Sequence, residues 1–323
     1  MHIPTFEDVL AAQQRIAPYI HNTPVMTSQY LNQLCGAELF FKCENLQKVG
    51  AFKARGACNA VFSLDDATAA RGVATHSSGN HAGALSYAAA RRGINATVVM
   101  PRTAPAAKKA AVRSYGGHIL ECEPTQAARE AMLAQVISDS GADLVHPYDD
   151  ARVIAGQATC ALELQQQVDG LDCLVAPVGG GGLIAGSCLA LAQVAPQTRI
   201  IAAEPAAADD AQRSLRAGEI QLRDGQHSVA DGLNTNLKPR TWHFISRYVE
   251  DILLASESEI VDAMYLTWER MKIIIEPSSA VPLAVILKNR QRFQGQRVGV
   301  IITGGNVDLK SCPGCPRVVE DGA

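Results

Sequence analysis

The chain has 323 residues, of which 47% are apolar and 19% are charged, and its formal net charge is -3. This length is enough to bury a large core and to divide into two domains, and the composition is ordinary for a globular enzyme. The weak net charge gives no electrostatic basis for binding nucleic acid or an anionic membrane, so we expect neither as a partner.

Neither residues 1–10 nor residues 173–198 predict export or a membrane span. Residues 1–10 lack the basic flank and the apolar run of a signal peptide. Residues 173–198 contain no charged side chain and are long enough to span a bilayer. Because Pro177 and four consecutive glycines interrupt this stretch, we predict a strand, a loop and a buried helix in a chain with no membrane span.

Nine cysteines are scattered along the chain, and an odd number without a framework is typical of free thiols in a cytoplasmic protein. Cys312 and Cys315 have the spacing of a redox or metal-binding pair. They lie in a polar tail with no second pair beside them, so we assign them no such function.

Predicted strands and helices alternate from residue 73 onward. The first series has strands at 73–75, 96–100, 118–122 and 143–146, with helices at 82–92, 106–115 and 125–140. The second series has strands at 173–176, 199–203 and 297–302, with helices at 183–194 and 257–272. Such alternation predicts parallel sheets covered by helices. We expect two sheets, one from the middle of the chain and one mainly from its second half.

Four consecutive glycines, residues 179–182, separate a predicted strand from a predicted helix. Glycines allow positive φ and a close approach of the backbone to a ligand, and the helix start presents free N–H groups and a positive dipole end. The segment is neither a P-loop nor a dinucleotide fingerprint. A tight turn does not require four glycines, so we interpret the loop as a phosphate site.

Three other segments could meet at that site. Lys53 lies in residues 50–56, beside the apolar Phe52; a lysine forms a Schiff base with an aldehyde and becomes nucleophilic when desolvated. Residues 77–81 offer hydroxyls, an amide and helix-start N–H groups, and residues 302–306 follow the last strand. Ligands of open α/β sheets bind at the carboxyl ends of strands, so the loops at 77–81 and 302–306 and the glycine loop can converge on one pocket.

Taken together, the motifs resemble the fold type II pyridoxal-phosphate enzymes, in the branch of serine racemase and threonine dehydratase. The matching segments run in family order between about Thr23 and Leu309, and they are residues 52–56, 75–81, 179–182, 268–271, 276–277 and 303–309. The resemblance implies a tryptophan synthase β-subunit-like α/β fold with two open parallel-sheet domains. It assigns residues 1–68 and 150–323 to a large cofactor-binding domain and residues 69–149 to a small one, with the active site between them. It also implies a homodimer.

The resemblance assigns a cofactor contact to each loop. Lys53 would be the catalytic lysine that holds pyridoxal 5'-phosphate as a Schiff base, with Phe52 against the ring and Asn80 on the ring hydroxyl. Thr303 would face the ring nitrogen, where its neutral hydroxyl suits elimination because it does not hold that nitrogen protonated as a carboxylate would. The phosphate would bind the glycines of the loop, which are Gly179, Gly180, Gly181 and Gly182.

The loop at residues 77–81 is matched to substrate binding. Ser77, Ser78, Asn80 and His81 would bind the α-carboxylate of an amino acid. In racemases of this branch the residue matching Ser78 is the acid/base on the face opposite the lysine, so racemase activity stays open.

A metal site is implied as well. Glu204 and Asp210 would supply carboxylate oxygens and Ala208 a main-chain carbonyl for magnesium, manganese or calcium, which prefer oxygen ligands. On spacing alone, the two acids would be interpreted as solvated side chains at a helix start.

Arg129 is the residue that matters most for substrate specificity. It matches an arginine of the serine racemase pocket, and the guanidinium fork binds carboxylates in a bidentate manner; without the resemblance it would be a surface arginine on a helix. The whole pattern looks most similar to bacterial 3-hydroxyaspartate dehydratases. That implies elimination of water to give oxaloacetate and ammonia, with Arg129 on the distal carboxylate and His146 or Tyr148 nearby. The alternatives are an L-serine/L-threonine dehydratase with serine racemase side activity, and a non-catalytic cofactor- or nucleotide-binding protein.

Overall fold

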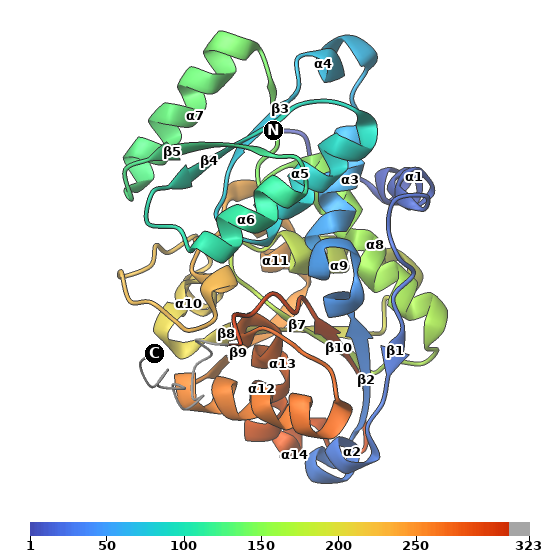
Figure 1. Cartoon of the computed structure of the whole chain (residues 1–323). Helices are drawn as coiled ribbons and strands as arrows, with labels where there is room; N and C mark the ends of the chain where they lie inside the picture. The colour runs from blue at the N-terminus through green and yellow to red at the C-terminus, as the bar shows by residue number, and fades with distance from the viewer. Residues whose placement is uncertain (310–323) are drawn as a thin grey trace, which may run out of the picture.

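The computed structural model describes residues 1–309, which form two sheets covered by helices (Figure 1). Cys312 and Cys315 lie outside the described residues.

The larger sheet has six strands in the order β1-β2-β10-β7-β8-β9. Only β1 runs antiparallel to its neighbour, and the other adjacent pairs are parallel. Because β2 pairs with β10, two segments from opposite ends of the chain lie side by side at the start of the site. The strands are β1 Val25–Met26, β2 Glu38–Cys43, β7 Cys173–Pro177, β8 Arg199–Pro205, β9 Val249–Ala255 and β10 Arg297–Ile302.

The smaller sheet has four parallel strands in the order β5-β4-β3-β6. All four come from the middle of the chain and lie in the upper part of Figure 1. The strands are β3 Val73–His76, β4 Ala96–Pro101, β5 His118–Cys122 and β6 Asp143–Leu144. The boundaries of the two predicted domains remain a prediction.

Helices cover both sheets. Those of the first half are α1 Phe6–Ile16, α2 Gln29–Cys35, α3 Lys53–Phe62, α4 Asp66–Ala70, α5 Asn80–Arg92, α6 Ala106–Ser114 and α7 Gln126–Ser140. Those of the second half are α8 Ala151–Gln167, α9 Gly182–Val194, α10 Asp210–Ala217, α11 Pro239–Tyr248, α12 Glu257–Met271, α13 Pro277–Lys288 and α14 Arg290–Phe293. Short 3-10 turns are η1 Glu44–Leu46, η2 Lys48–Gly50, η3 Ala206–Ala208 and η4 Asp231–Leu233.

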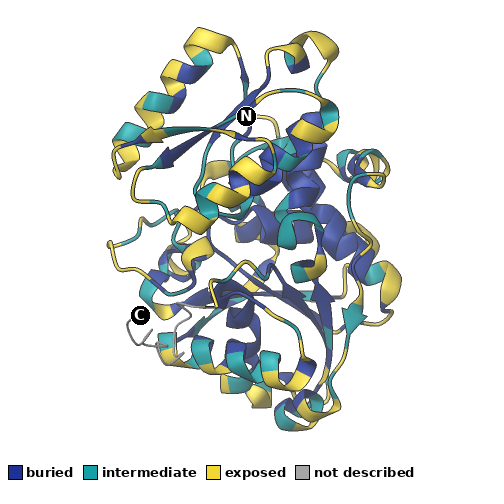
Figure 2. Cartoon of the chain, in the orientation of Figure 1, coloured by how far each residue is buried: buried dark blue, intermediate teal, exposed yellow. Residues whose placement is uncertain are grey.

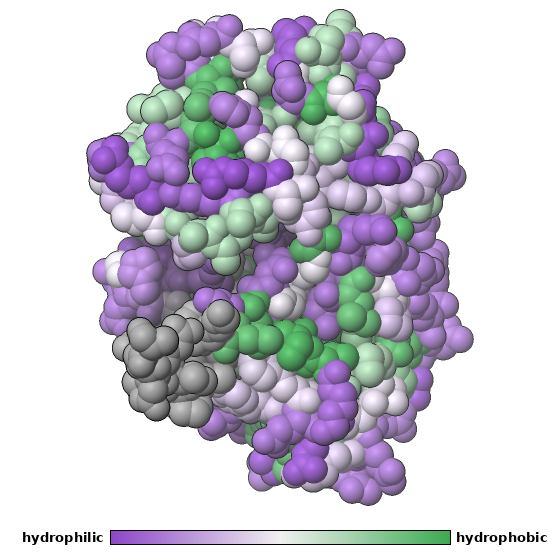
Figure 3. Space-filling model, viewed as in Figure 1, coloured by the Kyte–Doolittle hydropathy of each residue, from purple (hydrophilic) through white to green (hydrophobic). Residues whose placement is uncertain are grey.

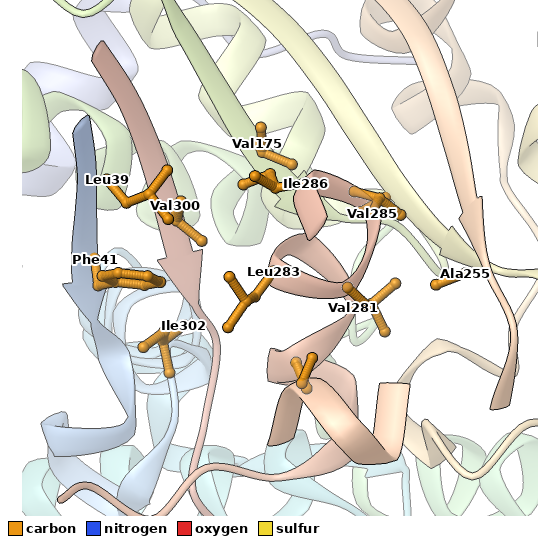
Figure 4. Close-up of a cluster of buried hydrophobic side chains, with 14 of the residues drawn as sticks. Leu39, Phe41, Val175, Ala255, Val281, Leu283, Val285, Ile286, Val300 and Ile302 are labelled. Carbon is orange, nitrogen blue, oxygen red and sulfur yellow. The ribbon is translucent and has the colours of Figure 1, made fainter. Parts of the chain in front are cut away.

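The core of the larger sheet is formed where α13 packs against strands β2, β10 and β7 (Figure 4). Phe41, Leu283 and Val300 are at most 2% exposed there, and burying each such side chain contributes about 1.5–3 kcal/mol. The central strands β10, β7 and β8 are buried along nearly their whole length, and Figure 2 shows exposed residues on the outer helices. The strand ends that carry the site therefore stand on a rigid base.

The predicted elements are present, with ends that differ from the expected ones by at most two residues. The uncharged stretch 173–198 forms β7, the glycine loop and the buried helix α9, as predicted. Among residues 1–309, no helix is both long enough and apolar enough to cross a bilayer.

Candidate active site

Lys53 is the first residue of α3, and its amine is enclosed. Its Nζ donates a hydrogen bond to the carbonyl oxygen of Pro147 at 2.8 Å. Burial lowers the pKa of Lys53 to about 8, and the negative charge of Glu276 opposes this only in part. The residue as a whole is partly exposed, so the desolvation acts on the ammonium end. A larger fraction of this amine is neutral at physiological pH than of an ordinary lysine.

The chain reaches Lys53 through a strained turn. Val49 and Gly50 have φ of 55° and 68°, a left-handed conformation that a β-branched residue rarely adopts. Directly after the turn, the main-chain N–H of Phe52 donates to the carbonyl of Thr303 at 2.9 Å. The turn therefore places Phe52, the residue before Lys53, against Thr303.

The Thr303 hydroxyl is buried and lies 2.9 Å from the hydroxyl of Ser279. Ser279 also bonds both the N–H and the carbonyl of Gly304. The residue predicted to face the ring nitrogen is thus part of a pair of neutral hydroxyls. Ser279 was not predicted, and its only sequence signal is its place in the segment that begins at Glu276.

The glycine loop, residues 179–182, presents bare main chain to a ligand because there is no room for side chains on it, and bare main-chain N–H groups suit a phosphate. A Cβ on Gly179 would lie 2.7 Å from the Cα of Leu233, and a Cβ on Gly180 would lie 2.4 Å from the ring of Tyr148. Gly181 has a φ of 87°, which favours glycine. Since α9 begins at Gly182, its first N–H groups lack helical partners and its dipole favours an anion.

The segment from Ser77 to His81 leads from β3 into the first residues of α5; residues 77–80 are half-buried and His81 is buried. His81 Nε2 lies 3.1 Å from the carbonyl oxygen of Val145, which can only accept, so Nε2 carries the proton. Burial, with a smaller effect of the Lys53 charge, lowers the pKa of His81 to about 3. The imidazole is neutral and its Nδ1 is an acceptor, so an α-carboxylate here would bind Ser77, Ser78 and main-chain N–H groups rather than this ring.

Asn80 contacts a residue to which no role was assigned. Its Nδ2 donates to both carboxylate oxygens of Glu276, at 2.9 and 3.1 Å. Burial raises the pKa of Glu276 to about 7, and the hydrogen bond from Asn80 lowers it by a smaller amount. The sequence signal was the pair Glu276 and Pro277 at a helix start, which carried part of the resemblance.

Arg129 lies in the first turn of α7, where its Nε donates to the carbonyl of Thr125 at 3.4 Å. Its positive charge acts on His76, at the end of β3. Burial lowers the pKa of His76, and the positive charges of Arg129 and Lys238 lower it further, against an opposing effect of Glu130. Arg129 and Lys238 therefore add positive charge around His76, the residue directly before the loop at residues 77–81.

His146 links this cationic region to Lys53. Its ring lies 6.1 Å from that of His76 and 4.7 Å from that of Tyr148, centroid to centroid. Its Nδ1 accepts from the N–H of Asp149 at 2.9 Å, and burial, with the neighbouring His76 and Lys238, lowers the pKa of His146 to about 4. Pro147, whose carbonyl holds Lys53, is the next residue. The expected neighbourhood of Arg129, His146 and Tyr148 is therefore compatible with the geometry.

The predicted metal ligands lie at the end of β8 and the start of α10. Glu204 accepts hydrogen bonds from the N–H groups of Ala211 and Gln212, at 2.8 and 2.9 Å. Both carboxylate oxygens of Asp210 are buried without a hydrogen-bond partner among the described residues, and the nearest cation, Arg223, is 3.9 Å away. Residues 1–309 contain no group of three or more His, Cys, Asp or Glu side chains that could hold a metal ion. A cation here would need main-chain or water oxygens as well.

Comparison with known proteins places the chain in a family. A family model described as pyridoxal-phosphate dependent enzyme matches residues 16–304. The beta-hydroxyaspartate dehydratase of Paracoccus denitrificans is 64% identical over 313 residues, which are 97% of this chain and 99% of that protein. The L-threo-3-hydroxyaspartate ammonia-lyase of Saccharomyces cerevisiae is 43% identical over 323 residues, with 100% and 99% covered.

Among solved structures, serine racemase from Dictyostelium discoideum superimposes with a TM-score of 0.91 at 49% identity, covering 95% of this chain and 99% of that one. The chain belongs to the pyridoxal-phosphate dependent enzymes of fold type II, and pyridoxal phosphate is its cofactor. The predicted family and fold are confirmed. The roles of single residues in the site remain predictions.

Proposed function

We propose that this enzyme is a dehydratase (an ammonia-lyase, hence a carbon-nitrogen lyase) that converts 3-hydroxyaspartate to oxaloacetate and ammonia by β-elimination of water. The observation that carries the proposal is the 64% identity, over nearly the whole chain, to the beta-hydroxyaspartate dehydratase of Paracoccus denitrificans. Arg129 and Lys238 also place positive charge near His76, beside the loop that would bind the α-carboxylate. A substrate with a second carboxylate complements that charge, whereas serine and threonine do not. The names of the Paracoccus and yeast relatives support the same substrate.

The reaction begins at the amine of Lys53. With a pKa of about 8, this amine is available to remove the proton from the substrate Cα, and the Pro147 carbonyl orients it. Bound pyridoxal phosphate supplies an electron sink for the charge that develops at Cα. The Thr303 and Ser279 hydroxyls would give the ring nitrogen a neutral partner. The electron pair left at Cα then forms the Cα–Cβ double bond as the Cβ–O bond breaks, and the β-hydroxyl takes up a proton, equivalent to the one that Lys53 removed, and leaves as water. The unsaturated amine that remains hydrolyses to oxaloacetate and ammonia.

Ser77, Ser78 and the first N–H groups of α5 bind the α-carboxylate at the positive end of that helix. Arg129 binds the distal carboxylate. Arg129 lies on α7, whereas the α-carboxylate would bind at the start of α5. Two different helices that cover the smaller sheet would therefore hold the two carboxylates of one substrate.

Substrate profiling of Arg129→Ala tests the proposal. Ammonia and oxaloacetate release would be measured with threo and erythro 3-hydroxyaspartate, and ammonia release with L-threonine and L-serine. We expect kcat/KM for 3-hydroxyaspartate to fall roughly 10- to 100-fold, since a hydrogen bond to a charged group contributes about 1.5–3 kcal/mol, with little change for L-threonine. Arg113→Ala, which removes an exposed arginine of α6, is the matched control. Unchanged selectivity in Arg129→Ala, or wild-type turnover of L-threonine that equals that of 3-hydroxyaspartate, would refute it.

A second candidate is an L-serine/L-threonine dehydratase with serine racemase side activity. It is favoured by Ser78 and by the likeness to Dictyostelium serine racemase. Formation of D-serine from L-serine, and its loss in Ser78→Ala, would support this candidate.

The proposal includes a divalent cation (magnesium, manganese or calcium) held by Glu204, Asp210 and the carbonyl of Ala208. The buried oxygens of Asp210 support it: they have no hydrogen-bond partner among the described residues, Arg223 is 3.9 Å away, and a buried carboxylate without close partners is costly. The hydrogen bonds from α10 to Glu204 are the competing structural use of that residue.

The proposal also includes the two-domain division, a cytoplasmic location and a homodimer. The free thiols of the described cysteines suit a reducing compartment.

A hydrophobic surface supports the proposed homodimer. The face in Figure 3 is hollowed between its upper and lower halves, and hydrophobic side chains gather on the lower half. Leu46 and Ile274 are 45% and 44% exposed, and Asn45 bonds the carbonyl of Ile274 at 3.1 Å, so the two lie close enough to belong to one contact surface.

A further inference from the structure

The side-chain amide of Asn80 is held at both of its ends. Its Nδ2 donates to Glu276, and its Oδ1 accepts from Nδ2 of Asn306 at 2.9 Å. Asn306 is itself fixed, because its Nδ2 also donates to the carbonyl of Val49 at 2.8 Å. A carboxylate only accepts hydrogen bonds, so the ionised Glu276 selects the orientation in which the amide nitrogen of Asn80 faces it.

Glu276 is built into this place. It is 5% exposed and precedes Pro277 at the start of α13, and its main-chain N–H donates to the carbonyl of Gly304 at 3.0 Å. A Cβ on Gly304 would lie 2.8 Å from Glu276 Oε1, so the glycine leaves the room that this carboxylate needs. A side chain enclosed in this way cannot follow a rotation of the amide, and its charge also acts on Lys53.

We propose that Glu276 is a positioning residue that fixes the amide of Asn80 so that its remaining N–H is donated to the ring hydroxyl oxygen of pyridoxal phosphate. The inference rests on the proposed contact between Asn80 and that hydroxyl. In this orientation Asn80 offers the ring oxygen a donor and no acceptor, which favours the ionised form of the oxygen. If the amide rotated, its carbonyl would face the ring oxygen and would favour the protonated form.

A double-mutant cycle on cofactor affinity tests the inference in the full-length protein. The dissociation constant of pyridoxal phosphate would be measured by fluorescence titration for the wild type, Glu276→Gln, Asn80→Ala and the double variant. Glutamine keeps the shape of Glu276 but presents a donor as well as an acceptor, so it no longer selects one orientation. We expect Glu276→Gln to weaken binding roughly threefold to tenfold, the range of one hydrogen bond. In the Asn80→Ala background the same change should have a clearly smaller effect, limited to the loss of the Glu276 charge near Lys53.

Two further variants separate this role from a general loss of structure. Glu259→Gln makes the same substitution at a half-buried carboxylate outside the site, one that accepts a hydrogen bond from the main-chain N–H of Ser256. It should leave the cofactor affinity unchanged. Asn306→Ala removes the other contact of the Asn80 amide and should weaken binding in the same direction as Glu276→Gln. Far-UV circular dichroism of each cofactor-free variant shows whether it has folded.

Equal losses from Glu276→Gln in the wild-type and Asn80→Ala backgrounds would overturn the inference, because Glu276 would then act without Asn80. Unchanged affinity in Glu276→Gln would overturn it as well. If Asn80→Ala itself leaves cofactor affinity unchanged, the contact of Asn80 with the cofactor is wrong and the inference falls with it. The substrate proposal is judged separately, by the selectivity of Arg129→Ala.

Discussion

Two groups of buried ionisable side chains lie on either side of the start of α3, and their charges are balanced differently. In the first group, the guanidinium of Arg55 is fully buried and binds Glu44 at 2.7 Å and Glu163 at 2.9 Å. Lys42 binds the same oxygen of Glu163 at 2.5 Å. Two cations and two carboxylates therefore meet with no charge left over.

The second group surrounds Lys53, two residues before Arg55. Its amine has a carbonyl as hydrogen-bond partner, and Glu276 is hydrogen-bonded to a neutral amide. Burial moves the pKa of Lys53 down to about 8 and that of Glu276 up to about 7. Glu163 behaves in the opposite way: although burial raises its pKa, hydrogen bonds and charge from Arg55 and Lys42 hold it below the ordinary value.

The difference separates two uses of buried charge. In the balanced group, direct ion pairs favour the ionised form of Glu163 and fix the packing of α3 on α8. Lys53 and Glu276 form no direct ion pair within residues 1–309 and can exchange a proton near neutral pH, as an acid/base catalyst must. Gly156 allows α8 to approach so closely, since a Cβ on it would lie 2.6 Å from the Cα of Gly56. The comparison predicts that the first group carries stability and the second carries activity.

The largest expected effect is on activity. Lys53→Ala should reduce ammonia release from 3-hydroxyaspartate by up to about 10⁴-fold, the upper range for loss of a positioned base. It should also abolish the visible absorbance of lysine-bound cofactor, with little change in the free energy of unfolding because Lys53 forms no direct ion pair among the described residues and its hydrogen-bond partner is the carbonyl of Pro147. Lys48→Ala, in the preceding turn, is the control and should keep both signals. Visible absorbance retained by Lys53→Ala would place the cofactor on another lysine.

The next largest effect is on stability. Arg55→Leu should lower the free energy of unfolding by about 3–5 kcal/mol, because it leaves Glu44 and Glu163 buried without their main partner. The matched control is Arg102→Leu, which breaks a 2.7 Å pair with Glu123 whose side chains are 60% and 59% exposed. That change should cost less than about 1 kcal/mol.

Urea unfolding followed by circular dichroism measures both values. Similar losses in Arg55→Leu and Arg102→Leu would contradict the comparison, because burial would then make no difference to the strength of these pairs.

Much of the fold follows from the sequence because its signals are local. Short apolar runs, each followed by a polar or glycine loop and a helix, predicted β3, β7 and β10 with their loops. The antiparallel strand β1 and the pairing of β2 with β10 were not predicted, because strand order depends on contacts between the two ends of the chain. The loops at residues 77–81, 179–182 and 302–306 were found because each of them follows a predicted strand, whereas the role of Lys53 came from the family resemblance.

The balanced group could not be predicted from the sequence. Lys42 and Glu163 are 121 residues apart in the sequence, and a lysine or a glutamate taken alone is expected at the surface. The same limit applies to Glu276 and Asn80, which are 196 residues apart. The tautomer of His81 depends on the carbonyl of Val145, which no side-chain pattern reveals.

The smallest expected effect concerns Asp210, whose buried oxygens lack the balance that Arg55 and Lys42 give to Glu163. A divalent cation bound there should stabilise the fold by about 2.7 kcal/mol at a concentration one hundred times its dissociation constant. Removing metal with EDTA should therefore lower the Tm by several degrees, at roughly 2–4 °C per kcal/mol, and added magnesium or manganese should restore it. Asp210→Ala should abolish this response, while Asp169→Ala, at an exposed acid, should retain it. An equal response in wild type and Asp210→Ala would place the cation elsewhere, and no response in wild type would leave Glu204 as the cap of α10 alone.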